Sequence, residues 1–205
     1  MTASEPRRQV VGEDWGQREL AGQHLADLDL TEVDLGEIEV AGVTFTGCVF
    51  RRCRFNASVF TDAAFTGCEF HGCTFFDARF VRCKLLGSRF VGCTFDLVQV
   101  DGGNWSFVSL RGAVLSGTRW RGTRLQEAEL DRVQAVDAVL HDLDLTGASL
   151  AGIRLDGADL RGSALWALDA REASLRGAIV TPDQALVLAA ALGVEVRDPH
   201  DDERR

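Results

Sequence analysis

The 205-residue sequence lacks most of the features that mark membrane proteins, metalloproteins and nucleotide-binding proteins. It has no apolar run long enough to cross a bilayer and no signal-peptide or lipidation motif, so we expect no membrane contact and a cytoplasmic location. Its six cysteines show no CxxC or Cys/His spacing suited to a metal ion, and it has no GxxxxGK[ST] phosphate loop. We therefore expect no metal and no cofactor.

Catalytic groups are equally sparse. The four histidines are His24, His71, His141 and His200. They fall at solvent-facing positions on different sides of the predicted fold or in the charged C-terminal segment. No nucleophile and no carboxylate pair shares a position that would favour a catalytic triad. The sequence predicts a protein that is not an enzyme.

The dominant feature of the sequence is a period of five. Every fifth residue from Leu20 to Val180 is apolar, and only Ala135 and Ala170 are undersized. An amphipathic helix repeats every 3.6 residues and a strand every 2, so neither explains the pattern. A sustained period of this kind indicates a repeat architecture. It also excludes the left-handed hexapeptide folds of acyltransferases.

Two other positions of each five-residue unit follow a rule. Two residues before each apolar centre the side chain is small or compact, and two residues after it glycine is frequent, as expected where a chain turns a corner. Each unit is therefore one side of a turning coil. The cysteines all occupy the small inward position, and we expect them to be buried, reduced thiols; they are Cys48, Cys53, Cys68, Cys73, Cys83 and Cys93.

These units resemble the pentapeptide-repeat family, whose tandem motif is A(D/N)LXX. Ala158-Asp159-Leu160-Arg161-Gly162 matches that motif directly. The resemblance implies an all-β fold, a right-handed quadrilateral β-helix of about eight coils at four pentapeptides per coil. Residues twenty apart then lie above one another, so Phe50, Phe70 and Phe90 are expected to form one internal column.

The predicted domain organisation has four parts. Residues 1–12 are a flexible leader, 13–180 the β-helix, 181–196 a C-terminal dimerisation helix with a short extension, and 197–205 a disordered tail. Within the β-helix, residues 96–107 depart from the pattern at Gly102-Gly103. This departure is either a local kink or a contact site for a partner.

The C-terminal helix has clear sequence signals. Thr181, Pro182 and Gln184 form an N-cap and capping box, and Gly193 ends the helix. Because the segment between them is apolar on all sides, one side should cover the open end of the β-helix and another should pair with a second copy. Simple end-capping, and a partner anchor at Trp166, remain alternatives. The predicted dimer interface is Trp166, Leu186, Val187, Leu188, Ala190 and Leu192.

Charge is segregated along the sequence. Residues 13–39 and 127–172 are acidic, whereas residues 51–124 are basic. We expect the outward acids of the second acidic stretch to form a partner-binding surface, although a merely solvated face is the alternative. These acids are Glu127, Glu129, Asp137, Asp142, Asp144, Asp156, Asp159, Asp169 and Glu172.

The ending also resembles the fluoroquinolone-resistance subgroup of the family, the MfpA type most closely and the Qnr type more distantly. Residues 173–178, the helix that follows them, and Trp15 carry this resemblance. It implies a homodimeric DNA mimic that binds a type II topoisomerase, DNA gyrase in particular, and inhibits it or protects it from quinolone-like or natural-product poisons. It implies no direct binding of nucleic acid. The alternative is a non-catalytic scaffold with a different partner.

Overall fold

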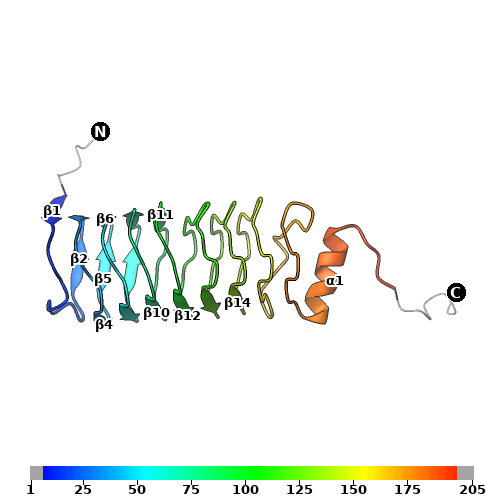
Figure 1. The fold of residues 1–205 in the computed structure, drawn as a ribbon, viewed down its shortest axis with the longest axis horizontal. Coiled ribbons are helices and arrows are strands. Elements are labelled where there is room, and N and C mark those ends of the chain that lie inside the picture. Colours follow the sequence, from blue (N-terminus) through cyan, green and yellow to red (C-terminus); the bar gives the residue numbers. More distant parts are fainter. Residues whose placement is uncertain (1–6, 198–205) are drawn as a thin grey trace.

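The chain folds into a rod of stacked coils that ends in a short helix (Figure 1). The computed structural model describes residues 7–197. All strand pairs are parallel and join residues twenty apart, from Arg8↔Leu28 at one end to the bridge Asp159↔Ile179 at the other. The predicted β-helix is confirmed. Each coil has four sides, which we number as faces 1 to 4 in chain order.

The strands stack in three columns, one on each of three faces. Face 1 contains β1 (Arg8–Val11), β3 (Leu28–Thr31), β6 (Val49–Arg51), β9 (Glu69–His71) and β11 (Arg89–Val91). Face 3 contains β4 (Glu39–Ala41), β7 (Val59–Thr61), β10 (Arg79–Val81), β12 (Gln99–Asp101), β13 (Arg119–Arg121) and β14 (Val139–His141). Face 4 contains β2 (His24–Ala26), β5 (Thr44–Thr46) and β8 (Ala64–Thr66).

Face 2 is held by isolated parallel bridges, such as Asp34↔Arg54 and Arg54↔Thr74. At nearly every corner between faces, the residue two positions after the apolar centre has a positive φ, near +50° to +71° in most coils. Glycine occupies many of these corners because it adopts this conformation without strain. The five-residue rule in the sequence therefore reflects the positive φ that the backbone requires at the four corners of each coil.

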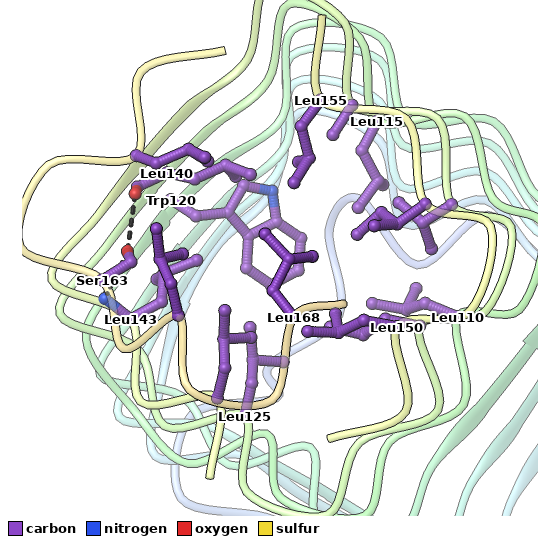
Figure 2. Close-up of a pocket in the computed structure, with 17 residues that line it drawn as sticks. Leu110, Leu115, Trp120, Leu125, Leu140, Leu143, Leu150, Leu155, Ser163 and Leu168 are labelled. Carbon is purple, nitrogen blue, oxygen red and sulfur yellow. Dashed lines mark hydrogen bonds between the residues drawn. The ribbon is translucent and has the colours of Figure 1, made fainter. Parts of the chain in front are cut away.

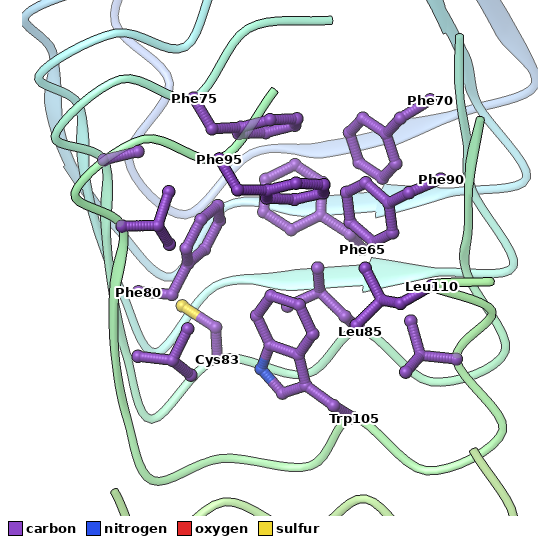
Figure 3. Packing of buried hydrophobic residues seen from close by; sticks show 14 of the residues in the cluster. Phe65, Phe70, Phe75, Phe80, Cys83, Leu85, Phe90, Phe95, Trp105 and Leu110 are labelled. Atoms are coloured by element: carbon purple, nitrogen blue, oxygen red, sulfur yellow. The ribbon is translucent and has the colours of Figure 1, made fainter. Parts of the chain in front are cut away.

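The phenylalanine column is confirmed (Figure 3). The ring centroids of Phe50 and Phe70 are 4.8 Å apart with an interplanar angle of 4°, and those of Phe70 and Phe90 are 4.5 Å apart at 5°. Phe55 and Phe75 stack in the same way in the next column. Aromatic rings of neighbouring columns meet edge to face, so the N-terminal half of the rod is filled by interlocked rings.

The C-terminal half is filled less completely. Its centres are mostly leucines, and they surround a cavity of about 40 Å³ whose lining is apolar except for Ser163 (Figure 2). The Ser163 hydroxyl donates to the carbonyl of Leu140 at 2.7 Å and accepts from the Leu143 amide at 2.9 Å, so it offers no free group to a water. A cavity with apolar walls stays dry.

The leader expected at residues 1–12 is wrong where the structure describes it. Arg8–Val11 form β1, which pairs with β3. The reason is visible in the period itself: Val10 and Trp15 occupy centre positions, are buried and extend the apolar core towards the N-terminus. Residues 1–6 of the predicted leader and residues 198–205 of the predicted tail lie outside the described residues.

The cysteines are free thiols on the inside of the coils, as expected. Each sulfur lies within hydrogen-bonding distance of a backbone carbonyl of the preceding coil, for example Cys73 Sγ to Phe50 O at 3.4 Å and Cys83 Sγ to Phe60 O at 3.2 Å. Burial raises the pKa of Cys83 to about 11. A buried thiol of this kind acts as a small core side chain.

The ladder is interrupted on one side of the middle coils. On face 2, no backbone hydrogen bond between described residues joins the segment 92–97 to the segment 112–117, although the same coils remain bonded on faces 1 and 3. An opening of about 270 Å³ lies between Gly92 and Gly112. Cys93 lines this opening and is the only cysteine that is not fully buried. The ladder is therefore open on one face of these coils only.

Gly103 has its own role in this region. It occupies the small inward position before Trp105, with φ of +90°, and a Cβ atom there would overlap the backbone carbonyl oxygen of Cys83. Strand β12 and the bridges Lys84↔Asn104 and Asn104↔Arg124 continue the ladder around it. Glycine is required at this position because the neighbouring backbone leaves no room for a side chain.

Replacing Gly103 tests this packing. We expect Gly103→Ala to lower the free energy of unfolding by about 1–3 kcal/mol more than a corner glycine substitution does, because backbone must move to admit the Cβ. The matched control is Gly67→Ala, where φ is +59° and no atom lies within 4 Å of the added Cβ. Urea unfolding of both variants measures the difference. Equal losses would contradict the close approach of Gly103 to Cys83.

Candidate functional site

The predicted acidic residues are spread around the rod. Glu129 and Asp169 lie on face 1, Asp156 on face 2, Asp159 on face 3 and Asp144 on face 4. Asp137, Asp142, Glu127 and Glu172 are at corners between faces. The structure therefore does not gather the nine side chains on one surface. It arranges them as a belt around the last coils before the helix.

Three corner carboxylates of one coil are accessible to a partner. Glu127, Asp137 and Asp142 are exposed, have φ of 54° to 55° and form no side-chain hydrogen bond or ion pair among the described residues. Each carboxylate lies over a glycine of the next coil, at a point where a Cβ would overlap it. The glycine twenty residues later leaves room for the acid.

Most other members of the belt are held by neighbours, but Glu172 is exposed and forms no side-chain hydrogen bond or ion pair among the described residues. The Ser109 hydroxyl donates to Glu129 at 2.8 Å, Gln126 Nε2 donates to Asp144 at 2.7 Å, and Ser174 donates to Asp156 at 2.5 Å. Hydrogen bonds from Thr146 and from Ser174 hold the pKa values of Asp144 and Asp156, respectively, below their usual range. Asp169 lies 3.5 Å from Arg171. These interactions leave the carboxylates less free to turn towards a partner.

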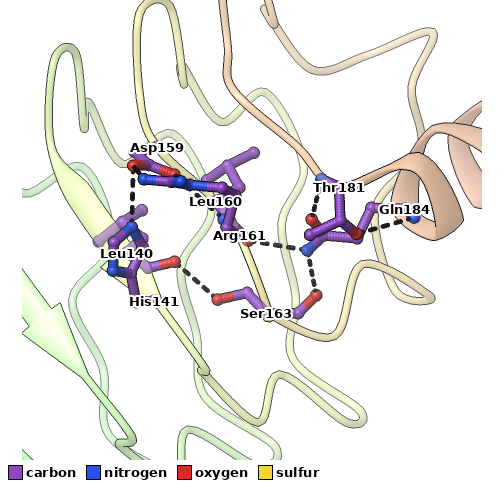
Figure 4. A network of polar contacts seen from close by, with 8 residues as sticks. All are labelled: Leu140, His141, Asp159, Leu160, Arg161, Ser163, Thr181 and Gln184. Carbon is purple, nitrogen blue, oxygen red and sulfur yellow. Dashed lines mark hydrogen bonds and ion pairs between the residues drawn. The ribbon is translucent and has the colours of Figure 1, made fainter.

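Asp159 is the most strongly engaged acid (Figure 4). Its carboxylate accepts from Arg161 Nε at 2.9 Å and Nη2 at 2.6 Å, and His141 Nε2 lies 2.9 Å from its Oδ2. The Arg161 guanidinium, with His141 in addition, holds the pKa of Asp159 well below its usual range. The side chain is only 14% exposed. We interpret Asp159 as a structural clamp between coils, which the sequence alone did not distinguish from a contact residue.

The sequence analysis did not identify Asp131 as a functional or structural residue. It is buried on face 1, lies 3.4 Å from Arg111 and accepts from the hydroxyl of Ser149 and the amide of Ala151. The hydrogen bond from Ser149 is the main cause that keeps its pKa low. The signal available in the sequence was the pair Arg111 and Asp131, which are twenty residues apart and therefore neighbours.

The part of the chain that the structure describes contains no candidate metal-binding site. No group of three or more His, Cys, Asp or Glu side chains is placed to hold a metal ion among these residues. The same residues include no helix that is long and apolar enough to cross a membrane.

Family comparisons agree with the coil geometry. A family model described as "Pentapeptide repeats (9 copies)" matches residues 41–84, and one described as "Pentapeptide repeats (8 copies)" matches residues 106–142 and 138–177. The chain belongs to the pentapeptide-repeat family. No curated protein matches this pentapeptide-repeat chain.

One solved pentapeptide-repeat structure, that of QnrB1, shares the fold. Full-length QnrB1, described as a plasmid-mediated fluoroquinolone resistance protein, aligns with a TM-score of 0.60 and 20% identity over 92% of this chain and 98% of its own. HetL from the cyanobacterium Nostoc, described as involved in heterocyst differentiation regulation, aligns with a TM-score of 0.35 and 18% identity over 84% of this chain and 89% of its own. At these identities the likeness to QnrB1 establishes the fold alone.

The C-terminal end of the pentapeptide-repeat rod is closed by α1 (Pro182–Ala191). Thr181 and Gln184 form the predicted capping box, and Gln184 Nε2 also donates to the carbonyls of Leu160 and Ser163, both at 2.7 Å (Figure 4). Val187 and Leu188 pack against the core. The expectation that one side of the helix covers the open end is confirmed.

The predicted dimer-interface residues separate into two groups. Val187 and Leu188 face the rod of their own chain, which explains part of the apolar character of the helix. Leu186 and Leu192 are each 52% exposed, and Ala190 is also exposed. Trp166 is 79% exposed. Residues 7–197 of its own chain therefore leave this indole largely uncovered.

The Asp159 clamp predicts a pH dependence of stability. A carboxylate whose pKa is lowered by folding stabilises the fold above its unfolded pKa, and this contribution is lost as the pH falls through the folded pKa. We therefore expect Asp159→Asn to lower the melting temperature at pH 7 and to lose less stability than the native protein between pH 5 and pH 2. Thermal unfolding monitored by circular dichroism measures this.

The control for this measurement is Asp137→Asn, at an exposed corner without an ion pair. Its loss of stability on acidification should follow that of the native protein. An Asp159→Asn variant that is as stable as the native protein at pH 7, with the same acid profile, would show that the clamp does not stabilise the rod.

Proposed function

We propose that this protein is a homodimeric DNA mimic that binds a type II topoisomerase, DNA gyrase, and that it modulates the enzyme and protects it from quinolone-like or natural-product poisons. We also propose that the protein is related to the MfpA and Qnr subgroup of the family. The observation that carries the proposal is the belt of carboxylates around the last coils, with three exposed and unpaired acids at the corners of a single coil.

The charge per unit length of the belt supports mimicry of DNA, whereas the charge per unit length of the whole rod does not. Residues 13–180 carry far fewer net negative charges than duplex DNA of equal length. Residues 127–172, however, contain ten acids and four basic side chains, a net charge of −6. They span about 11 Å of the axis at roughly 4.8 Å per coil. B-DNA of that length has about 6 charges.

The arrangement of these charges also suits a DNA-binding surface. Phosphates surround a duplex on all sides, and the acids of the belt occupy all four faces and the corners between them. A single acidic face would contact one side of a groove only. A belt can contact both walls of a groove that closes around a duplex.

Gyrase assays test the proposal. We expect the native protein to change the supercoiling rate of gyrase or to reduce the DNA cleavage that a quinolone induces. We expect the triple variant Glu127→Gln, Asp137→Asn, Asp142→Asn to require at least about tenfold more protein for the same effect, because charge complementarity controls encounter and register. Asparagine is tolerated at positive φ, so the coil should remain intact.

The matched control is the triple variant Asp27→Asn, Glu37→Gln, Asp77→Asn. These acids also occupy exposed corners with positive φ and form no ion pair among the described residues. The control makes the same change in net charge and should behave like the native protein. Equal loss in both variants would assign the effect to net charge, and no effect of the native protein on gyrase would leave the alternative of a scaffold with another partner.

In the proposed dimer, the two protomers meet at their C-terminal ends, with one acidic belt on each side of the contact. Leu186, Leu192 and Trp166 supply exposed apolar surface at that end of the rod, and Val194 and Val196 extend it. Exposed apolar surface of this kind is typical of a protein interface. A two-fold axis there would double the length of the acidic zone.

The oligomeric state can be changed at two positions. We expect the native protein to be a dimer by light scattering and Leu186→Glu, Leu192→Glu to be a folded monomer, because charges would be buried in the contact. Leu97→Glu is the control, since Leu97 is 55% exposed at a corner in the middle of the rod. A native monomer, or a dimer that survives both glutamates, would overturn the proposed interface.

A further inference from the structure

Ion pairs between coils follow a simple rule on most of the rod. An arginine and an acid twenty residues apart face each other, as in Arg52 with Glu32 at 2.9 Å, Arg82 with Asp62 at 2.7 Å and Arg111 with Asp131 at 3.4 Å.

Three arginines on face 3 break this rule. Arg79 is paired in register with Val59 and Gln99, and Arg119 with Gln99 and Val139. Arg121 is the third; it is paired in register with Asp101 and His141 and forms no ion pair with Asp101. None of the three forms an ion pair with another described residue, and all three are exposed.

These arginines surround a shallow groove. It has a volume of about 370 Å³ and is lined by residues of β10, β12, β13 and β14, of which β10, β12 and β14 are marked along one edge of the rod in Figure 1. The side chains of β12, Gln99 and Asp101, are shorter than the arginines on both sides. The groove therefore follows β12 across the rod, with Arg79 on one wall and Arg119 and Arg121 on the other.

The balance of charge in and around the groove is positive. Asp101 is the only acid that lines it, against three arginines. On the adjoining face 4, Lys84 and Arg124 lie in one column through Asn104, and neither forms an ion pair with a described residue. The groove therefore presents more positive than negative charge to a partner.

We propose that this groove binds an extended acidic segment of a partner protein. Carboxylates on alternate sides of such a segment would meet the guanidinium groups of Arg79 on one wall and of Arg119 and Arg121 on the other. A guanidinium binds a carboxylate through two parallel hydrogen bonds. Val81 and Val139 at the edges of the groove would contact the aliphatic parts of the side chains of the same segment.

A protein segment fits the surroundings better than a nucleic acid. A duplex laid along face 3 would meet Glu19 and Glu39 towards one end of the rod and Asp142 and Asp159 towards the other. The whole chain also has a net charge of −9. A short acidic segment that crosses the rod contacts only the basic coils. This inference concerns the arginines of β10 and β13, none of which belongs to the acidic belt, and does not depend on the gyrase contact.

The probe for the test is a fluorescein-labelled peptide of ten glutamates, titrated with the full-length protein and followed by fluorescence anisotropy. We expect saturable binding that weakens at least about tenfold between 50 mM and 200 mM salt, because surface charge interactions are screened. The triple variant Arg79→Gln, Arg119→Gln, Arg121→Gln should bind at least tenfold more weakly than the native protein at 50 mM salt.

The matched control is Arg89→Gln, Arg132→Gln, Arg176→Gln, which removes three arginines outside the groove that also form no ion pair with described residues. Its affinity should stay within about twofold of the native value, and circular dichroism should show that both variants are folded. Three results would each overturn the proposal: no saturable binding of the peptide, equal loss in the two variants, or tighter binding of a twenty-base-pair DNA duplex than of the peptide at the same salt concentration.

Discussion

The vertical register of twenty residues is the constraint on which the rest of this structure depends. It aligns the backbone hydrogen bonds of successive coils and stacks the rings of Phe50, Phe70 and Phe90 at 4.5 to 4.8 Å. Because an error of one residue in a coil would turn every inward side chain outward or to a corner, the register allows no insertion within the ladder. The outside of the rod can then vary freely in charge.

The interior and the ladder both change in the middle of the rod. On the N-terminal side of Trp105 the core contains stacked aromatic rings. On the C-terminal side of Trp120 it contains leucines, which leave a small dry cavity. The opening on face 2 and Gly103, where the chain passes close to Cys83, lie at this transition. We interpret the opening as the result of joining two differently packed halves, since faces 1 and 3 stay bonded. The basic groove, which is lined by residues from Arg79 to Val139, crosses this transition.

Sequence reasoning predicted the repeat, the corners, the inward cysteines and the capped helix because each follows from spacing alone. It placed the start of the rod too late because Val10 and Trp15 were not counted in the period. It could not separate Asp159, held by Arg161 and His141, from Asp137, which is free, because both are outward acids in the sequence. The break on face 2 has no sequence signal of its own. Pairing of bases with acids is visible only once residues twenty apart are known to be neighbours.

Unfolding of two internal deletion variants, followed by far-ultraviolet circular dichroism, tests the stacking register most directly. Removal of residues 61–80 takes out one whole coil and joins Phe60 to Val81 in the correct phase, whereas removal of residues 61–78 joins Phe60 to Arg79 two residues out of phase. The account predicts that the first variant keeps a β-sheet spectrum and unfolds cooperatively, and that the second does not. Two variants with the same spectrum and the same unfolding midpoint would contradict it.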